Sequence, residues 1–300
     1  MSGPDSGQTK GSVEAPLVIM FAGPNGSGKS TINRRILQNP ESNFHGEYIN
    51  ADDIARSLAS EIANYRDRNI KAAEIAGQRR RQAMREGRSF AFETVMSTPE
   101  KVAIMTQAKA LGYDVFLVFV TTDDPEKNVH RVADRVAKGG HSVEPHAIRR
   151  RYRCTMALLP CAVEHADTAL IVDNSQGKPR EVAMKKADGR LQELASSPPP
   201  WVFDKLLKPY QARRASREQI ESAFHAQCAN KACLADADAG NGKTYCGKIV
   251  EVAPHHVLQQ ISAGKFIVHD RSLSAPQKLA RGKQATIGYA YDKGKITARS

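Results

Sequence analysis

The sequence predicts an α/β protein with a mostly parallel sheet of five to six strands flanked by helices, followed by a small, mostly-β domain. Three observations support this prediction. Apolar runs alternate with amphipathic stretches up to about Asn174, a glycine-rich segment follows the first apolar run, and short β-branched runs dominate from Gly240 onward. This order is typical of a parallel sheet covered by helices on both faces and of a separate β-rich module.

The first half contains five apolar runs with the length and composition of buried strands. They are LVIMFAG (17–23), EYIN (47–50), SFAFE (89–93), DVFLVFV (114–120) and TALIVD (168–173). The stretches between them predict helices after Lys29, across 53–86, from Pro99 and across 125–164. Because the crossovers between parallel strands are right-handed, ligands are expected at the carboxyl ends of the strands.

The second half begins with a predicted hairpin and a proline-rich boundary. Residues 180–194 predict two strands around an Asp188-Gly189 turn, and the prolines at 198–200 continue neither a strand nor a helix. A helical stretch at 216–228 precedes the short strands YCGKIVEVA, HHVLQQI, KFIVHD and ATIGYAY. The predicted organisation is a disordered tail (1–14), a first domain (15–195), a proline-rich linker (196–214) and a helix with a small β-rich domain (215–300).

The bulk composition favours an anionic partner. The 300 residues carry a formal net charge of +12, which suits either nucleic acid or nucleotide substrates. The apolar runs fall far short of the roughly 20 residues that cross a bilayer, and the polar start lacks a signal peptide. We therefore expect a cytoplasmic protein with no membrane partner, and we expect its five cysteines, an odd number, to be free thiols.

The glycine-rich segment GPNGSGKST has the Gly-x-x-x-x-Gly-Lys-Ser spacing of a P-loop. In such a loop, backbone N–H groups surround the β-phosphate, the lysine reaches the β- and γ-phosphates, and the serine hydroxyl joins the Mg²⁺ shell. Lys29 is therefore predicted to bind ATP and Ser30 to bind Mg²⁺. The predicted nucleotide-binding residues are Gly23, Pro24, Asn25, Gly26, Ser27, Gly28, Lys29, Ser30 and Thr31.

Carboxylates stand at the ends of two further predicted strands. In YINADDIA, Asp52 and Asp53 begin a helix, and one of them is predicted to cap it while the other takes the proton of an acceptor hydroxyl. Glu93 ends the apolar strand of FAFETVMS, where a carboxylate seldom lies without a partner. Glu93 is predicted to orient substrate or to bind Mg²⁺ through water, and a structural salt bridge is the alternative.

The segment NVHRVADRVAKGGHSVEPHAIRRRY predicts two helices joined by a Gly139-Gly140 hinge. Arg131 and Arg135 are four residues apart and share one helix face. A hinged pair of this kind has the form of a lid that brings an arginine to the transferred phosphoryl group and excludes water. Structural salt bridges are the alternative for both arginines, and His141 is interpreted as a polar contact at the helix boundary.

Together these segments resemble the zeta-toxin family of P-loop kinases over roughly residues 16–175. The resemblance rests on GPNGSGKST, NADDIA, FETVMS, GYDVFLVFV and RVADRVAKGGHSVEPHAIRRRY. It implies a bacterial toxin that transfers the ATP γ-phosphate to the 3′-hydroxyl of the amino sugar of UDP-N-acetylglucosamine. It also implies a small protein antitoxin that blocks the nucleotide site.

The same resemblance implies roles for single residues. Lys29 matches the P-loop lysine, Asp52 the general base and Glu93 the substrate-contacting glutamate. Arg135 matches the first phosphate-stabilising arginine, while gapped matching puts His141 near the second, with Arg150 as its alternative. This departure leaves other nucleotide-like acceptors open. The predicted catalytic set is Lys29, Asp52, Glu93, Arg131, Arg135 and Arg150.

The segment from about Lys243 to Thr297 resembles the KfrB-type domain of plasmid- and conjugation-associated bacterial proteins, chiefly in HHVLQQ and FIVHD. Alternation along the strands favours structural contacts over metal binding for its histidines. Two alternatives to a small-molecule kinase stay open: a nucleic-acid-associated NTPase or polynucleotide kinase of a conjugative element, and a non-catalytic module switched by nucleotide. Few aromatic residues accompany the C-terminal lysines, which gives the nucleic-acid alternative little support.

Overall fold

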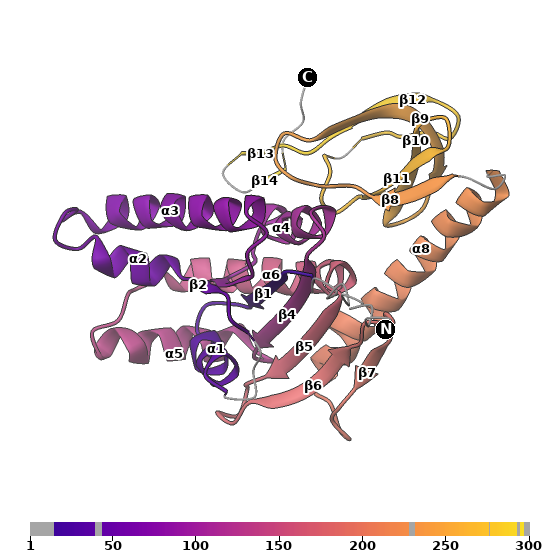
Figure 1. Cartoon of the computed structure of the whole chain (residues 1–300). Coiled ribbons are helices and arrows are strands. Elements are labelled where there is room, and N and C mark those ends of the chain that lie inside the picture. The colour runs from indigo at the N-terminus through magenta and orange to yellow at the C-terminus, as the bar shows by residue number, and fades with distance from the viewer. Residues whose placement is uncertain (1–14, 40–43, 228–231, 276, 293–294, 297–300) are drawn as a thin grey trace, which may run out of the picture.

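The structure is a computed structural model that describes residues 15–39, 44–227, 232–275, 277–292 and 295–296 (Figure 1). The tail predicted at residues 1–14 and Cys228 lie outside these ranges. The other four cysteines are free thiols. None of the described helices has the length and apolar character needed to cross a membrane.

The first half folds around a seven-stranded sheet with the order β2-β3-β1-β4-β5-β6-β7. The first five strands in this order are parallel, and β6 and β7 form an antiparallel hairpin. The predicted α/β fold is confirmed. The predicted hairpin at 180–194 is present as β6 and β7 and brings the sheet to seven strands, where five to six were expected. The strands are β1 (Leu17–Ala22), β2 (Glu47–Ile49), β3 (Phe90–Thr94), β4 (Asp114–Thr121), β5 (Thr168–Asp173), β6 (Arg180–Lys185) and β7 (Leu191–Glu193).

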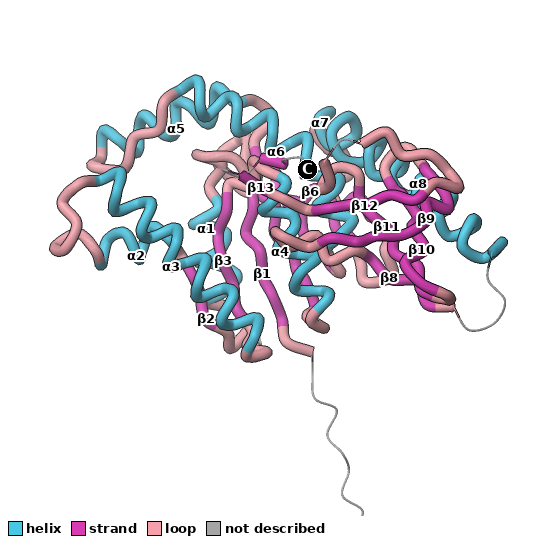
Figure 2. The backbone as a smooth tube through the Cα atoms, turned by 90° about the horizontal axis from the view of Figure 1, so that it is seen from above, coloured by secondary structure: helices cyan, strands magenta, loops and turns pink. Residues whose placement is uncertain are grey.

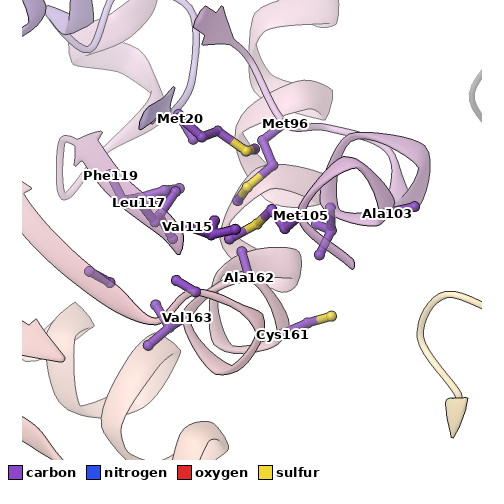
Figure 3. Close-up of a cluster of buried hydrophobic side chains, with 14 of the residues drawn as sticks. Met20, Met96, Ala103, Met105, Val115, Leu117, Phe119, Cys161, Ala162 and Val163 are labelled. Atoms are coloured by element: carbon purple, nitrogen blue, oxygen red, sulfur yellow. The ribbon is translucent and has the colours of Figure 1, made fainter. Parts of the chain in front are cut away.

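Helices cover both faces of this sheet. Along β1, Val18 and Met20 face a core shared with α3, α4 and α6, whereas Ile19 and Phe21 face α1. Figure 3 shows the first core, where methionines of β1 and α4 meet β4 and α6. The helices are α1 (Lys29–Leu37), α2 (Ala51–Ser57), α3 (Tyr65–Arg85), α4 (Pro99–Ala110), α5 (Pro125–Ala137) and α6 (Pro145–His165).

The second half forms a smaller β domain on a long helix. Its sheet has the order β12-β9-β10-β11-β8, and Ile220 and Phe224 of α8 pack against one face of it (Figure 1). The strands are β8 (Cys233–Asp236), β9 (Thr244–Val252), β10 (His256–Ser262), β11 (Lys265–Asp270) and β12 (Gln284–Gly288), with the pair β13 (Tyr291–Asp292) and β14 (Lys295–Ile296) beside them.

The region predicted as a linker is largely helical. Helix α7 (Pro200–Val202) runs through a π-helical turn (Phe203–Leu207) into α8 (Lys208–Gln227). The segment predicted as a linker is therefore helical from Pro200 onward. Pro200 occupies the first helical position, where its missing N–H removes no helical hydrogen bond. Trp201 packs back onto the first sheet, because its indole N–H donates to Asp173 at the end of β5 at 2.8 Å.

A buried network of charged side chains joins the two domains. Arg213 of α8 donates to both Glu164 of α6 and Asp270 of β11. His165 Nε2 lies 2.9 Å from Asp270 Oδ2, and His256 Nε2 lies 3.0 Å from Glu164 Oε1. The β domain is therefore fixed to the helical layer that covers the first sheet.

Candidate functional site

The P-loop connects β1 to α1 with glycines at positions that admit no side chain. A Cβ on Gly23 would lie 1.9 Å from the carbonyl oxygen of Val120. Gly28, with φ of 93°, is the N-cap of α1, and a Cβ there would lie 2.3 Å from Asn174 Nδ2. Only glycine therefore lets this backbone turn closely enough to point its N–H groups at a phosphate.

Lys29 and Ser30 begin α1 beside the end of β3. Lys29 Nζ donates to the carbonyl oxygen of Pro24 at 2.8 Å and lies 3.8 Å from Glu93 Oε1. Ser30 Oγ donates to Glu93 Oε2 at 3.1 Å. Burial lowers the pKa of Lys29 more than the charge of Glu93 raises it. A further negative charge at this point would thus stabilise the ammonium group.

One cavity of about 810 Å³ unites the P-loop with the ends of several other elements. Five of the six predicted catalytic residues line it. They are Lys29, Asp52, Glu93, Arg131 and Arg135. Of the predicted nucleotide-binding residues, Asn25, Gly26, Gly28, Lys29, Ser30 and Thr31 also line the cavity.

Three buried side-chain atoms around this cavity have no hydrogen-bond partner among the described residues. They are Ser27 Oγ, Arg131 Nη1 and Asn174 Oδ1. The rest of each group is firmly held: Asn174 Nδ2 donates to the Ser27 carbonyl at 2.8 Å, and Arg131 Nη2 donates to the Asn174 carbonyl at 2.7 Å. Buried polar atoms are normally paired, so this cluster marks a place where a polar ligand would supply the partners.

The two aspartates of α2 differ in their surroundings. Asn50 caps the helix, because its Oδ1 accepts from the backbone N–H of Asp52 at 2.9 Å. The prediction that one aspartate is the cap was therefore wrong, since both lie inside the first turn. Asp52 faces the cavity, whereas Asp53 pairs with Arg56 on the exposed surface. The Asn50 side chain, two positions before Asp52, accepts from a backbone N–H that has no partner within the helix.

The two helices of the predicted lid meet at the Gly139-Gly140 turn. Arg135 Nη2 donates to the carbonyl oxygen of His141 at 3.0 Å, and the His141 side chain lines the cavity. Arg150, in contrast, is exposed and lies outside the cavity wall. Its neighbour Arg151 lines the cavity instead and donates to Asn25 Oδ1 at 3.3 Å.

Several cavity residues were missed by the sequence analysis. Asn174 follows β5 in a stretch that reads as an ordinary turn, and Tyr65 and Asn69 lie near the start of a helix whose polar residues read as solvent-exposed. A usable signal existed for Asn174 alone, because it ends the strand next but one to the P-loop strand, at the ligand-binding edge of the sheet.

The interdomain network brings metal-ligand types close together. Within the described part of the chain, two sets of three residues place ligand atoms within 4.8 Å of one another. The sets are Cys161, His165 and Asp270, and Glu164, His256 and Asp270. Arg213 already supplies the positive charge that a metal would bring, because it bonds to both carboxylates. These residues therefore form an ion-pair network, in which Arg213 bonds to both carboxylates and His256 to Glu164.

Comparisons with known proteins find a match in each half of the chain. A family model described as an AAA domain matches residues 18–153, and a KfrB domain model matches residues 244–298, which confirms the predicted KfrB resemblance. An uncharacterised protein of Haemophilus influenzae is 29% identical over 134 residues, which are 45% of this chain and 91% of that protein.

Two solved structures are similar to the chain at low identity. The AvrRxo1-ORF1:-ORF2 complex with ATP has a TM-score of 0.50 at 14% identity, over 65% of this chain and 64% of that one, so the chain spans less than two thirds of it. The PezAT chromosomal toxin-antitoxin system of Streptococcus pneumoniae has a TM-score of 0.43 at 16% identity, over 72% of this chain and 90% of that one. The first half of the chain thus has the fold of a P-loop, AAA-type domain.

Proposed function

We propose that the chain is an ATP-dependent phosphotransferase that moves the γ-phosphate to a hydroxyl group of a small, nucleotide-like acceptor. One observation carries this proposal: Lys29, Asp52 and Arg135 line the same cavity, although they come from α1, α2 and α5. A nucleotide-binding switch needs the P-loop alone. A cavity that adds a carboxylate and a lid arginine has the groups required for transfer.

The P-loop side of the cavity fits a triphosphate. Gly26 and Gly28 have positive φ values of 74° and 93°, which turns the loop around the space in front of Lys29. Arg131 Nη1 is a buried donor without a partner among the described residues, and a phosphate oxygen would satisfy it. The same negative charge would restore the pKa of Lys29 that burial lowers.

The contact between Ser30 and Glu93 fits a hydrated Mg²⁺ ion. Their oxygen atoms, 3.1 Å apart at the β3 edge of the P-loop, are the hard ligands that Mg²⁺ prefers. Ser30 and Glu93 would hold the ion, which would supply positive charge to neutralise the phosphates. In this proposal Glu93 holds water ligands of the ion, which is one of the two roles that the sequence left open for it.

The reaction follows from the remaining groups. The acceptor hydroxyl gives its proton to the carboxylate of Asp52, and its oxygen forms a bond to the γ-phosphorus of ATP. The bond between that phosphorus and the bridging oxygen breaks, so ADP leaves. Arg135 and Arg131 stabilise the charge that spreads over the transferred group, and Lys29 holds the leaving phosphate.

The acceptor that we favour is UDP-N-acetylglucosamine, by the resemblance to the zeta-toxin family. That resemblance also supports a toxic role in a bacterial host and a protein antitoxin that occupies the nucleotide site. In place of the predicted Arg150, Arg151 is our candidate for the second cationic group, because it reaches the cavity from α6.

The test is a search for the phosphorylated product. The full-length protein is incubated with γ-labelled ATP and a panel of UDP-sugars, nucleosides, dinucleotides and short oligonucleotides, with the Lys29→Ala protein as control. We expect transfer to UDP-N-acetylglucosamine in the wild type alone, with the product identified by mass spectrometry. Label on oligonucleotide ends would support the polynucleotide-kinase alternative, and label on none of the panel would count against a kinase.

A further inference from the structure

Two aromatic rings meet at the cavity wall from segments far apart in the chain. Tyr65 is the first residue of α3, and His141 follows the Gly139-Gly140 turn between α5 and α6. Their ring centroids are 5.1 Å apart and the planes are tilted by 36°. Both residues line the cavity. In Figures 1 and 2, α2, α3 and α5 project toward the same end of the molecule, which is where the two segments meet.

The Tyr65 ring is held by its own helical hairpin. The guanidinium carbon of Arg68 lies 5.7 Å from the ring centroid, and Arg68 Nη1 donates to the carbonyl of Ile62 at 3.2 Å. Asn64 caps α3 through two backbone N–H groups. The ring therefore belongs to the α2–α3 unit, and the same unit carries Asp52 at the start of α2.

His141 connects this ring to the lid arginine. Its carbonyl oxygen accepts a hydrogen bond from Arg135 Nη2 at 3.0 Å, while its ring lies against Tyr65. The position of Arg135 is thus linked through one residue to the unit that carries Asp52. Among the described residues, the Tyr65 hydroxyl makes no hydrogen bond, so the ring itself makes the contact.

We propose that Tyr65 is a positioning residue for phosphate transfer: its ring holds His141, and thereby Arg135, over the cavity while Asp52 faces the acceptor. This inference rests on the proposed phosphotransferase function and adds to it a residue from outside the P-loop and the lid. Tyr65 touches neither reacting group in this role. The Tyr65 ring connects the α2–α3 unit, whose Asp52 accepts the proton, with Arg135, which stabilises the phosphoryl group.

The variants Tyr65→Ala, Tyr65→Phe and Arg135→Ala, with the double variant Tyr65→Ala/Arg135→Ala, test the proposal by a double-mutant cycle. UDP-N-acetylglucosamine is the acceptor probe, and ATP hydrolysis replaces it if that sugar nucleotide is not phosphorylated. We expect Tyr65→Ala to lower kcat by about 10²-fold, the scale of an ångström-sized misplacement, with an unchanged Kd for ATP. Tyr65→Phe should restore the rate, and the double variant should be no slower than Arg135→Ala.

Ile70→Ala is the matched control, because Ile70 lies on the same helix, is 52% exposed and stands outside the cavity. If Tyr65→Ala changes only the acceptor KM, the positioning role is wrong. The same holds if the loss of kcat in the double variant equals the product of the losses in Tyr65→Ala and Arg135→Ala. A hydroxyl-dependent effect, with Tyr65→Phe as slow as Tyr65→Ala, would do the same.

Trypsin cleavage after Lys138 gives a readout that needs no turnover, because this exposed lysine precedes the lid turn. Tyr65→Ala should speed this cleavage at least about fivefold if opening of the lid limits it, while Tyr65→Phe and Ile70→Ala should not. Equal cleavage of all proteins would refute the contact as a support of the lid. A wild type that turns over no substrate but shows this cleavage pattern would reject the proposed function and keep the inference about the lid.

Discussion

Among the residues that the structure describes, polar side chains around the P-loop cavity are buried with atoms left unpaired, whereas in the network between the two domains each charged group has a partner. Arg131 and Asn174 show the first condition, and Arg213 and Asp270 the second. An unpaired buried donor or acceptor costs about 1–3 kcal/mol, so a ligand that pairs with these atoms would be bound favourably. The P-loop cavity therefore has the character of a binding site. The interdomain network has the character of a structural cluster, although it contains more of the residue types that bind metals.

The pKa shifts repeat this contrast. Burial by itself would raise the pKa of Glu164, but the hydrogen bond from His256 and the charge of Arg213 outweigh it and lower the pKa to about 2. Burial lowers the pKa of Lys29, and its acidic neighbours Glu93 and Asp52 do not compensate. The network is thus electrostatically complete, and the cavity has room for further negative charge.

The largest effect should come from Lys29→Ala, which removes the buried cation from the P-loop cavity. We expect phosphate transfer to fall by about 10³-fold, the scale for charges that contact the transferred group. The free energy of unfolding should change by only about 1 kcal/mol, because the lost contacts to Pro24 and Glu93 are offset by removal of a buried ammonium group that burial disfavours. Enzyme assays and urea unfolding measure the two quantities, with exposed Lys71→Ala as control. Loss of the fold in place of activity would make Lys29 a structural residue.

Asp52→Asn should produce the next largest effect, because it removes the carboxylate that takes the proton. We expect transfer to slow by about 10²-fold or more, with the ATP affinity nearly unchanged. Asp53→Asn is the matched control on the same helical turn. It breaks the exposed pair with Arg56, which contributes about 1 kcal/mol or less to stability. If Asp53→Asn slows transfer and Asp52→Asn does not, the wrong aspartate has been assigned.

Arg213→Met tests the ion-pair network between the two domains. The substitution leaves Glu164 and Asp270 buried without their shared cation, and we expect a loss of about 3–5 kcal/mol in the free energy of unfolding. Arg214→Met, on the same helix, removes a more exposed arginine 3.9 Å from Glu218 and should cost about 1 kcal/mol or less. Urea unfolding compares the two variants. An Arg213→Met protein as stable as the wild type would remove the contrast between the regions.

How far the sequence predicted these regions depends on how local their signals are. The P-loop, the strands and the strand-end positions of Asp52 and Glu93 come from short patterns, and the structure brings these residues together. Arg150 was predicted where Arg151 lines the cavity, because one residue rotates a helix position by about 100° and the phase of α6 depends on its packing. The sequence did not identify Asn50 as the cap of α2, because Asp52 and Asp53 shortly after it are also typical capping residues.

The interdomain network had no local signal. Glu164, Arg213 and Asp270 come from α6, α8 and β11, and nothing within a few residues of each indicates the partner. Trp201 likewise meets Asp173 only after the chain turns back along the sheet. The prolines at 198–200 suggested a linker, because Pro200 reads the same at the start of a helix as in an irregular segment.

The last prediction concerns the pH dependence of stability in the wild type and in Glu164→Gln. The folded pKa of Glu164, about 2, lies below its ordinary value of 4.5, so its ionisation stabilises the fold above pH 4.5 and the contribution is lost as the pH falls toward 2. The wild type should therefore exceed Glu164→Gln in the free energy of unfolding at pH 7, and the gap should narrow between about pH 5 and pH 2.

Chemical denaturation across this pH range measures the gap, with exposed Glu61→Gln as the matched substitution outside the network. Subtracting the free energy of unfolding of the variant from that of the wild type cancels the contributions of the other acid-sensitive groups. One of these groups is His269, because burial lowers its pKa to about 3. A gap that stays constant down to pH 3 would mean that the ionised form of Glu164 is not what Arg213 and His256 stabilise. Packing would then be the main contribution of the network to stability. The claim that the network differs from the cavity in its electrostatics would be wrong.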